Sequence, residues 1–311
     1  MRSEYKQGKK RRKWPKIVGS IFLLIILAGL GYGFMIYKSL TDAVETMHQP
    51  VEHKSDKRQE DITLANKEPF SVLMMGVDQR KGDKGRSDTM IVLSVNPNKN
   101  SVKMLSIPRD TRTEIIGKGF EDKINHAYAF GNEEMAMATV ENFLDIPIDY
   151  YLKVNMEGFK DIVDAVGGVT VNNSKAFSQG GYQFNEGPNN LNGKEALAYV
   201  RMRKQDPEGD FGRQNRQRQI IQGVIKKGIS VNSLTNYDDI FEALGKNVRT
   251  NMTFNEMKDI QKNYKSAAGN IEQMTLKGTG QTINKVWYLI VPQEEQARVQ
   301  EELKTHLELQ N

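Results

Sequence analysis

The sequence predicts an α/β protein: a three-layer α/β/α sandwich with a mixed central sheet, preceded by one N-terminal transmembrane helix. Two observations lead to this prediction. Short apolar runs alternate along the chain with helical patterns, as in proteins whose helices cover a sheet. Near the N-terminus, residues 17–37 form an uncharged run of 21 residues. A helix of that length spans the hydrocarbon core of a bilayer.

The strands are predicted from apolar runs that end at turn residues. FSVLMMGV, residues 70–77, is followed by Asp78 and a loop rich in Gly and Lys. Residues 89–95 and 102–107 flank the turn NPNKN, which indicates a hairpin. Later strands are expected within 145–154, 167–171 and 285–291. Helices are expected at 133–144, 156–166, 193–201 with Asn192 as N-cap, about 212–227, and 294–307.

The apolar run at 17–37 has the flanks of a retained membrane anchor. Lys16 and Lys38 bracket it, and Trp14 and Tyr37 stand where interfacial aromatics usually lie. A cleavable signal peptide would have a shorter apolar core, about 7–15 residues, and a small-residue cleavage site. We therefore predict a cytoplasmic tail at 1–16, a signal anchor at 17–37, an extracellular stalk and linker at 38–66, and an extracellular catalytic domain at 67–311. The protein is then a single-pass type II membrane protein.

Charge and composition exclude several classes of function. Residues 1–16 hold eight basic side chains and one acid, so they carry +7; since the whole chain is +5, the remaining residues carry −2. A mildly acidic domain lacks the electrostatic footprint of a nucleic-acid-binding protein, so no nucleic acid is expected as partner. There is no cysteine, and the four histidines have no metal-ligand spacing, which excludes disulfides and argues against a zinc hydrolase.

Charged residues follow apolar strands at three places, and strand ends are where α/β sheets bind ligands. The first, GVDQRKGDKGRSDTM, contains Asp78, Arg86 and Asp88. The second, SIPRDT, contains Arg109 and Asp110. The third is RMRKQDPEGDFGRQNRQRQ, residues 201–219. No P-loop and no GxGxxG motif is present, so nucleotide-driven chemistry of the usual kind is disfavoured.

In the third segment the spacing separates the arginines by direction. Arg201 and Arg203 project to one side if the backbone is extended, and Arg213, Arg216 and Gln217 can share a helix face. Arg218 is expected to point outward. Converging guanidinium groups suit a polyanion such as a pyrophosphate, and aspartates suit Mg²⁺ bridging phosphate oxygens. The alternative is a solvated surface in which Asp206, Asp210 and the other acids neutralise the arginines.

At these residues the sequence resembles the LytR-CpsA-Psr family. The matching motifs are FSVLMMGVDQRKGDKGRSDTM, SIPRDT, DKINHAYAFG and LNGKEALAYVRMRKQDPEGDFGRQNRQRQ. The resemblance implies an α/β/α enzyme of the Gram-positive cell envelope, a transferase of phosphorus-containing groups. Such an enzyme moves a glycopolymer, such as wall teichoic acid, from undecaprenyl pyrophosphate to the 6-hydroxyl of N-acetylmuramic acid in peptidoglycan. An apolar pocket is implied for the polyprenyl tail, with Mg²⁺ (replaceable by Mn²⁺) at its mouth.

Residue by residue, the resemblance implies metal-associated roles for Asp78 and Asp88. It implies a catalytic centre of Asp88, Arg109 and Arg203. It assigns the pyrophosphate to Arg86, Arg109, Arg201, Arg203, Arg213 and Gln217. Where the family often has a second glycine after AYAFG, this chain has Asn132, which we expect to leave the chemistry unaffected. Two alternatives stay open, a membrane-anchored lipid-pyrophosphate-binding regulator and a polyprenyl-pyrophosphate hydrolase.

Overall fold

The computed structural model describes residues 32–58, 60, 62–77, 85–203, 206–230 and 237–309. The predicted cytoplasmic tail and residues 17–31 of the predicted anchor lie outside these ranges. Within the described part of the chain, no helix combines the length and the apolar character needed to cross a bilayer.

The centre of the molecule is a six-stranded sheet with the order β11-β6-β1-β2-β3-β12. The β1–β2, β2–β3 and β6–β11 pairs are antiparallel, and the β1–β6 and β3–β12 pairs are parallel. The predicted mixed central sheet is therefore confirmed. Its strands are β1 (Phe70–Val77), β2 (Ser87–Asn96), β3 (Ser101–Ser106), β6 (Tyr150–Asn155), β11 (Val248–Thr250) and β12 (Ile271–Met274).

The predicted hairpin is the β2–β3 pair, and its turn has a local cause. The side-chain oxygen of Asn96 accepts hydrogen bonds from the backbone N–H groups of Asn98 and Lys99, at 2.8 and 3.0 Å. Asn100 takes a positive φ of 49°, a conformation that asparagine tolerates better than most residues. The turn residues thus set the register that places Ile91 opposite Ser106.

One face of the sheet is covered by α2 (His126–Leu144) and α8 (Gln293–Leu307). Side chains from both helices and from alternate positions of β1 form one buried core, which includes Leu73, Met75 and Val77. Helix α2 begins seven residues before the predicted start at 133, and it is interrupted by non-helical backbone at Gly131 and Asn132. The interruption breaks the apolar period, so the sequence pattern indicated only its second half.

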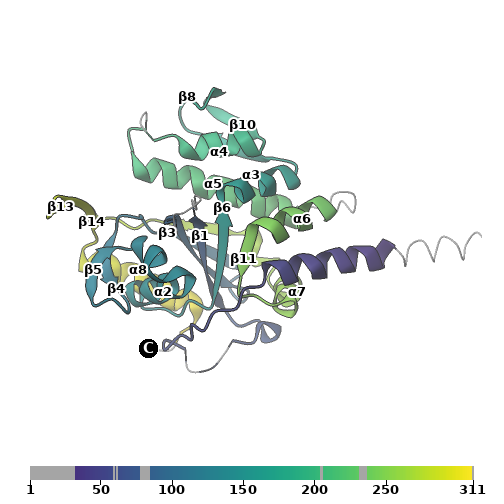
Figure 1. Ribbon diagram of the computed structural model, residues 1–311, viewed down its shortest axis with the longest axis horizontal. Helices are drawn as coiled ribbons and strands as arrows, with labels where there is room; N and C mark the ends of the chain where they lie inside the picture. Colours follow the sequence, from purple (N-terminus) through teal and green to yellow (C-terminus); the bar gives the residue numbers. More distant parts are fainter. Residues whose placement is uncertain are drawn as a thin grey trace, which may run out of the picture.

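The other face of β1 packs against a second set of elements. Phe70 and Val72 join a core with η1 (Leu64–Asn66), α7 (Phe254–Asn263) and η2 (Ala267–Gly269). Farther along the strands, α3 (Met156–Ala165), α4 (Gly193–Arg201), α5 (Asp210–Ser230) and α6 (Tyr237–Asn247) stand over the ends of the sheet (Figure 1). Helices therefore lie on both faces, as expected for an α/β protein.

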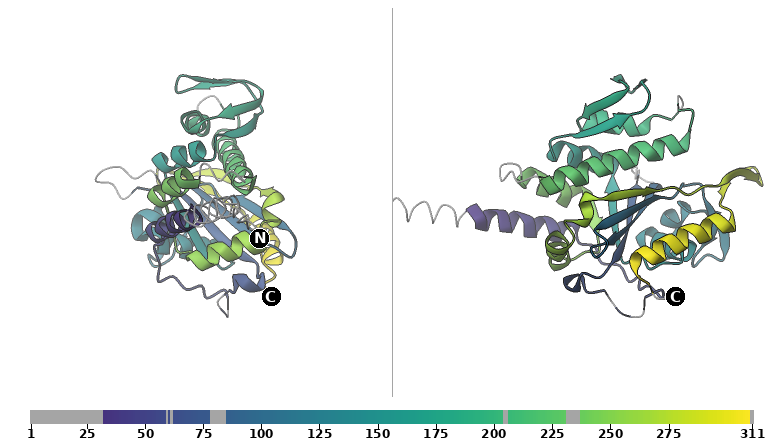
Figure 2. Two further views of the ribbon diagram at one scale, coloured as in Figure 1. Left: turned by 90° about the vertical axis from the view of Figure 1, so that its right-hand side faces the viewer. Right: turned by 180° about the vertical axis from the view of Figure 1, so that it is seen from behind.

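Helices α3, α4 and α5 enclose a separate apolar core together with short strands. Figure 2 shows from two further sides that these helices and strands lie above the sheet. Asn192 caps α4: its side chain accepts from the backbone N–H of Glu195, whose carboxylate accepts from the N–H of Asn192. This confirms the predicted N-cap. The strands here are β7 (Val169–Asn173), β8 (Phe177–Gln179), β9 (Tyr182–Phe184) and β10 (Gly187–Leu191).

Two further hairpins lie at the periphery of the sheet. The first is β4 (Arg112–Ile115) with β5 (Phe120–Lys123), and the second is β13 (Thr279–Ile283) with β14 (Val286–Ile290). The strand predicted at 285–291 is β14, which pairs with β13 and not with the central sheet.

The segment predicted as a stalk lies against the domain over part of its length. Residues 32–47 form a helix in which Ala43, Val44 and Met47 are buried. Gly245 of α6 permits this approach, since a Cβ there would lie 3.2 Å from the Cα of Ala43. His48 then bridges to Thr250 of β11. The start of the domain is thus tied to the edge strand of the sheet.

Candidate functional site

An aspartate and an arginine from neighbouring strands meet at the end of β1. Asp88 follows a register irregularity between β1 and β2 at Gly76 and Val77. Its Oδ1 accepts a hydrogen bond from Nη1 of Arg109 at 2.7 Å. Nε of Arg109 lies 3.6 Å from Asp110 Oδ2, and Asp110 Oδ1 accepts from Lys123 at 2.6 Å. Arg109 is therefore held between two carboxylates at the edge of the sheet.

The first turn of α5 brings a second arginine to this place. Nη2 of Arg213 lies 2.9 Å from Asp210 Oδ1. Burial lowers the pKa of the Arg213 guanidinium; Asp210 opposes this, and the positive charges of Arg109 and Arg203 lower the pKa further. For Arg109, burial also disfavours the charge, but Asp88 and then Asp110 outweigh it and raise the pKa. The positive charges of Arg109 and Arg203 therefore act on Arg213, although the three residues come from separate parts of the fold.

Two of these arginines have unused hydrogen-bond donors. Nε of Arg109 and Nε of Arg213 are buried, and neither has a hydrogen-bond partner within the described residues. A buried donor without an acceptor costs about 1–3 kcal/mol. An anion bound between these guanidinium groups would remove that cost and the repulsion between them. The arrangement is therefore that of an oxyanion site.

Arg201 and Arg203 are both exposed, and Met202 between them is buried. Met202 has extended backbone at the end of α4, so its two neighbours project away from the core together. Arg203 is near enough for its charge to act on Arg213. Arg86 is exposed just before Asp88. The structure thus brings together Asp88, Arg109, Arg203 and Arg213, with Arg86 and Arg201 on the surface.

The prediction that Arg216 shares the inward face with Arg213 needs correction, because Arg216 is a buried structural residue. Its Nε and Nη2 donate to the carbonyl oxygens of Tyr199 and Met202, at 3.1 and 2.6 Å, and its Nη1 pairs with Asp206 at 2.5 Å. These contacts close the end of α4 and anchor Asp206. A glycine is required at position 212, beside Asp206, since a Cβ at that position would lie 1.9 Å from Asp206 Oδ2. Asp206 thus orders the loop, whereas Asp210 lies at the arginine cluster.

The prediction that Arg218 points outward was wrong. Its side chain is buried, and its Nε donates to the Oε1 of Gln273 on β12 at 2.9 Å. The residue spacing correctly predicted that Arg218 points away from Arg213. That side of α5 is nevertheless covered by the sheet's edge strand, a long-range contact that no local pattern reveals.

Gln217 connects the arginine cluster to an apolar pocket. Its amide donates to Thr89 Oγ1 on β2 at 2.8 Å, and both residues line the pocket. The pocket has a volume of about 260 Å³ and lies between β1, β6 and the helices α3 to α6. Nearly all of its lining is aliphatic, aromatic or methionine: Met74, Met75, Leu152, Val154, Met156, Phe159, Ile162, Val163, Leu197, Val200, Ile220, Ile221, Val224, Ile225, Leu244 and Val248.

The sequence motifs named polar residues of the cluster, and the resemblance implied an apolar pocket, but neither identified the residues that line it. Its lining comes from eight separate elements, and its apolar residues also fit ordinary core packing. The signal that could have found it is helix α5, where Ile220, Ile221, Val224 and Ile225 continue beyond Gln217. Only the neighbouring helices show that these side chains line a cavity.

Asp78, one of the two predicted metal ligands, lies outside the described residues, as do residues 79–84. Within the described chain, no group of three or more acidic or histidine side chains could hold a metal ion. Asp88 by itself fits the way Mg²⁺ binds at phosphate sites, where one or two carboxylates suffice because phosphates and water supply the other oxygens. Its side chain is part exposed at the cluster.

Taken together, the fold and the site define a class: an α/β protein in which a largely apolar pocket adjoins a cluster of arginines. The model of the LytR_cpsA_psr family matches residues 34–305. The chain belongs to this family.

Curated relatives and solved structures agree with that assignment. The chain is 51% identical over 308 residues to the polyisoprenyl-teichoic acid–peptidoglycan teichoic acid transferase TagU of Bacillus subtilis, covering 99% of this chain and 100% of that one. A relative of the same name from Halalkalibacterium halodurans is 55% identical over 296 residues, covering 94% and 97%. Relatives at this identity are transferases, and the chain is an enzyme of that class.

Two solved structures extend the comparison. The crystal structure of B. subtilis TagU aligns with a TM-score of 0.64 at 53% identity, covering 79% of this chain and 99% of that one. A structure of TagT bound to LIIa-WTA aligns with a TM-score of 0.72 at 30% identity, covering 84% and 100%.

Proposed function

We propose that this enzyme transfers an anionic glycopolymer, wall teichoic acid, from undecaprenyl pyrophosphate to the 6-hydroxyl of N-acetylmuramic acid in peptidoglycan. The observation that carries the proposal is the junction at Gln217 between the apolar pocket and the arginine cluster. A polyprenyl pyrophosphate has the matching shape: a long apolar tail and a compact anionic head. The names of the relatives support the choice of polymer and acceptor.

In the proposed reaction the arginines stabilise the leaving group. The muramic hydroxyl attacks the phosphorus that carries the polymer, and the bond to undecaprenyl phosphate breaks. Arg109 and Arg213 donate their free Nε–H groups to oxygens of the pyrophosphate, and Arg203 adds positive charge. Preorganised donors of this kind favour the transition state, where charge grows on the departing phosphate. The reaction uses the energy of the pyrophosphate bond and requires no ATP.

Asp88 has two proposed roles. It accepts a hydrogen bond from Arg109 and so fixes that guanidinium, and with Asp78 it would hold Mg²⁺. When bound, Mg²⁺ neutralises pyrophosphate oxygens, as in other phosphoryl transfers, and Mn²⁺ can substitute. A loose transition state needs little help from a general base, so the chemistry does not depend on a carboxylate freed for that purpose.

The proposed setting is the outer face of the membrane in a Gram-positive cell envelope, with residues 17–37 as the anchor. An anchored enzyme meets its lipid-linked donor in the plane of the bilayer. The apolar pocket then binds the polyprenyl tail of the donor, which leaves the bilayer. The peptidoglycan acceptor lies on the same side.

The test is a reconstituted transfer reaction with the full chain in detergent. The reactants are a lipid-pyrophosphate-linked polymer and a soluble peptidoglycan oligomer, and both products are measured. We expect undecaprenyl phosphate to be released in step with polymer bound to peptidoglycan. Free polymer would identify a hydrolase, and donor binding without turnover would identify a regulator; either result contradicts the proposal.

The arginine assignment has its own test in the same assay. Replacing Arg109 or Arg203 by alanine should lower the transfer rate about 100-fold or more, the range for losing a donor aimed at developing charge. Circular dichroism should stay unchanged, since Arg203 is exposed and Arg109 lies at the sheet edge. Unchanged turnover of either variant would remove that residue from the proposed mechanism.

A further inference from the structure

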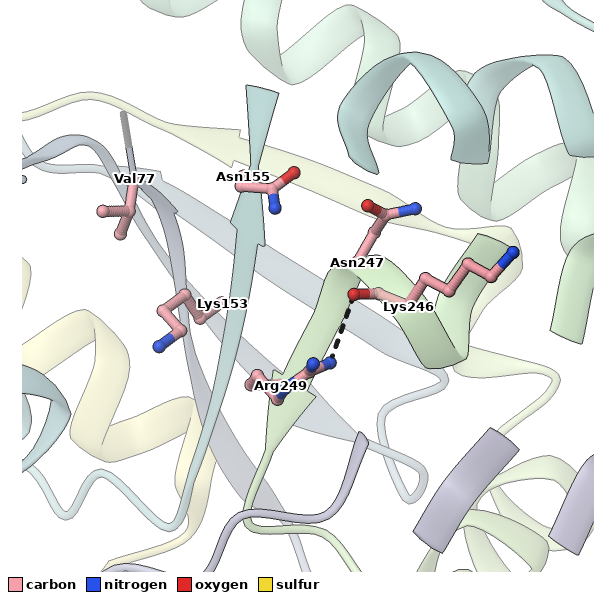
Figure 3. A pocket seen from close by; sticks show the side chains of 6 residues that line it. All are labelled: Val77, Lys153, Asn155, Lys246, Asn247 and Arg249. Carbon is pink, nitrogen blue, oxygen red and sulfur yellow. Dashed lines mark hydrogen bonds between the residues drawn. The ribbon is translucent and has the colours of Figure 1, made fainter. Parts of the chain in front are cut away.

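A second, basic pocket lies beside the arginine cluster and plays no part in the mechanism above. It has a volume of about 150 Å³ and is lined by Val77, Lys153, Asn155, Lys246, Asn247 and Arg249. Figure 3 shows these side chains around the ends of β1 and β6, the end of α6 and the start of β11. Val77 pairs with Ser87, the residue before Asp88, so the pocket adjoins the proposed reaction centre.

The two pockets open on opposite faces of the sheet. Gly76 and Val154 line the apolar pocket. Val77 and Lys153, one position away on the same strands, line the basic pocket. Because successive side chains of a strand point to opposite faces, β1 and β6 separate the two spaces. Asn155, the last residue of β6, borders both, so they come together only at the edge of the sheet.

The basic pocket has one positive charge in excess. Lys153 pairs with Glu133 of α2, and Lys246 pairs with Glu242. Nη1 of Arg249 donates to the carbonyl oxygens of Gly245 and Val248 at 3.0 and 2.6 Å, and more weakly to that of Lys246. No described carboxylate lies within ion-pair distance of Arg249. Its charge is therefore available to an anionic ligand. The amides beside it are engaged within the fold: Asn155 Oδ1 accepts from the N–H of Gly158, and Asn247 Nδ2 donates to Asp161 Oδ2 at 2.9 Å and to the carbonyl oxygen of Ala243 at 3.0 Å.

The geometry of phosphoryl transfer indicates which substrate this pocket serves. The attacking and leaving oxygens stand roughly in line across the phosphorus. In the proposed function the leaving phosphate stays with the lipid tail, on the apolar-pocket face. With the phosphorus at the end of the sheet, between the two pockets, the acceptor would approach from the side of the basic pocket. Strands are spaced about 4.8 Å apart, so β6 lies roughly 10 Å from Asp88 on β2.

We propose that the basic pocket is an acceptor subsite that binds a carboxylate of the peptidoglycan stem peptide and so orients the muramic hydroxyl for attack. This inference rests on the proposed function, because it assigns a place to the acceptor of that reaction. Its chemistry is a single carboxylate held by Arg249, beside the ion-paired ammonium groups of Lys153 and Lys246.

The main variant is Arg249→Gln, measured in the full chain by steady-state kinetics with each substrate varied in turn. We expect the KM for the acceptor to rise about 30-fold or more, the range for truncating one partner of a desolvated charge pair, with the donor KM unchanged. With an acceptor whose stem-peptide carboxylates are amidated, the wild type and the variant should perform alike. Arg249→Lys, which keeps the charge, should recover part of the loss.

A second variant guards against an effect on folding, since Arg249 also binds carbonyls at the end of α6. Lys246 is exposed in the last turn of α6, and Lys246→Glu should raise the acceptor KM without loss of structure. Lys262 is exposed in the last turn of α7, remote from both pockets, so Lys262→Glu is the matched control and should leave both KM values unchanged.

The outcomes separate this inference from the proposed function. If the wild type transfers polymer and neither variant changes the acceptor KM, the subsite is wrong and the function stands. A rise in the donor KM instead would place a donor phosphate in the pocket and also overturn the inference. If the wild type releases free polymer or nothing, the proposed function itself fails. Direct calorimetric titration with the acceptor fragment, without donor, then still reports whether Arg249→Gln weakens its binding.

Discussion

The buried arginine behind the site, Arg216, offers the sharpest test of how Asp206 and the end of α4 are held. Replacing Arg216 by methionine removes the partner of Asp206, whose side chain is only 6% exposed. It also removes two hydrogen bonds to the end of α4 and the contact with the ring of Phe177, 5.5 Å from the guanidinium carbon. Methionine is apolar and of similar length, so the space stays filled.

The size of the effect follows from the carboxylate left behind. Breaking a buried ion pair by removing one partner costs about 3–5 kcal/mol, mostly because the other charge stays buried without compensation. We therefore expect Arg216→Met to lower the free energy of unfolding by about 4 kcal/mol. Adding Asp206→Asn to this variant should recover about 2 kcal/mol, because the uncompensated charge is then gone.

The assay is urea unfolding of the full chain in detergent, followed by circular dichroism. The control is Lys246→Met, which removes a lysine whose side chain is 67% exposed and whose partner Glu242 is 61% exposed. Exposed pairs contribute about 0–1 kcal/mol, so this variant should stay near the wild type. A cost for Arg216→Met below that of the control, or no recovery in the double variant, would refute the argument that this ion pair holds the loop.

The remaining predictions concern the metal, pH and backbone strain. Asp88→Ala should weaken the dependence of transfer on Mg²⁺, and a titration identical to the wild type would count against Asp88 as a ligand. Burial, and then the charges of Lys103 and Lys99, lower the pKa of His306 from 6.5 to about 4. Between pH 6.5 and 4 the unfolded chain binds a proton at this histidine that the folded chain does not bind, so the free energy of unfolding should fall by up to about 3 kcal/mol over that range. In urea unfolding, the stability of the His306→Gln variant should depend less on pH than that of the wild type. An equal pH dependence of the two proteins would contradict the prediction. Asn132 has φ 56° and ψ −146°, which strains any residue but glycine by about 1–3 kcal/mol, so Asn132→Gly should raise stability by about 1 kcal/mol and leave transfer unchanged. A melting temperature of Asn132→Gly below that of the wild type would contradict the argument that Asn132 is strained.

Local patterns in the sequence predicted the elements whose cause is local. The apolar run at 70–77, the asparagine turn after β2 and the capping box of α4 each depend on residues within a few positions, and the structure places all three as expected. Strand β11 and helix α7 were not predicted. Residues 248–250 are too short for a pattern, and they become a strand only because β6 offers its free edge.

The sequence by itself determined the membership of the family, the mixed α/β fold and the polar residues at the mouth of the site, because motif order and short-range periodicity are properties of the chain. Only the tertiary structure decided how the arginines of residues 201–219 divide. Arg213 and Arg203 join Arg109 at the mouth, whereas Arg216 and Arg218 are buried against α4 and β12. Spacing along a helix sets the direction in which a side chain points. The element that lies in that direction comes from a distant part of the sequence. The same reason hid the lining residues of the apolar pocket and the whole of the basic pocket, whose walls meet only after the sheet has formed.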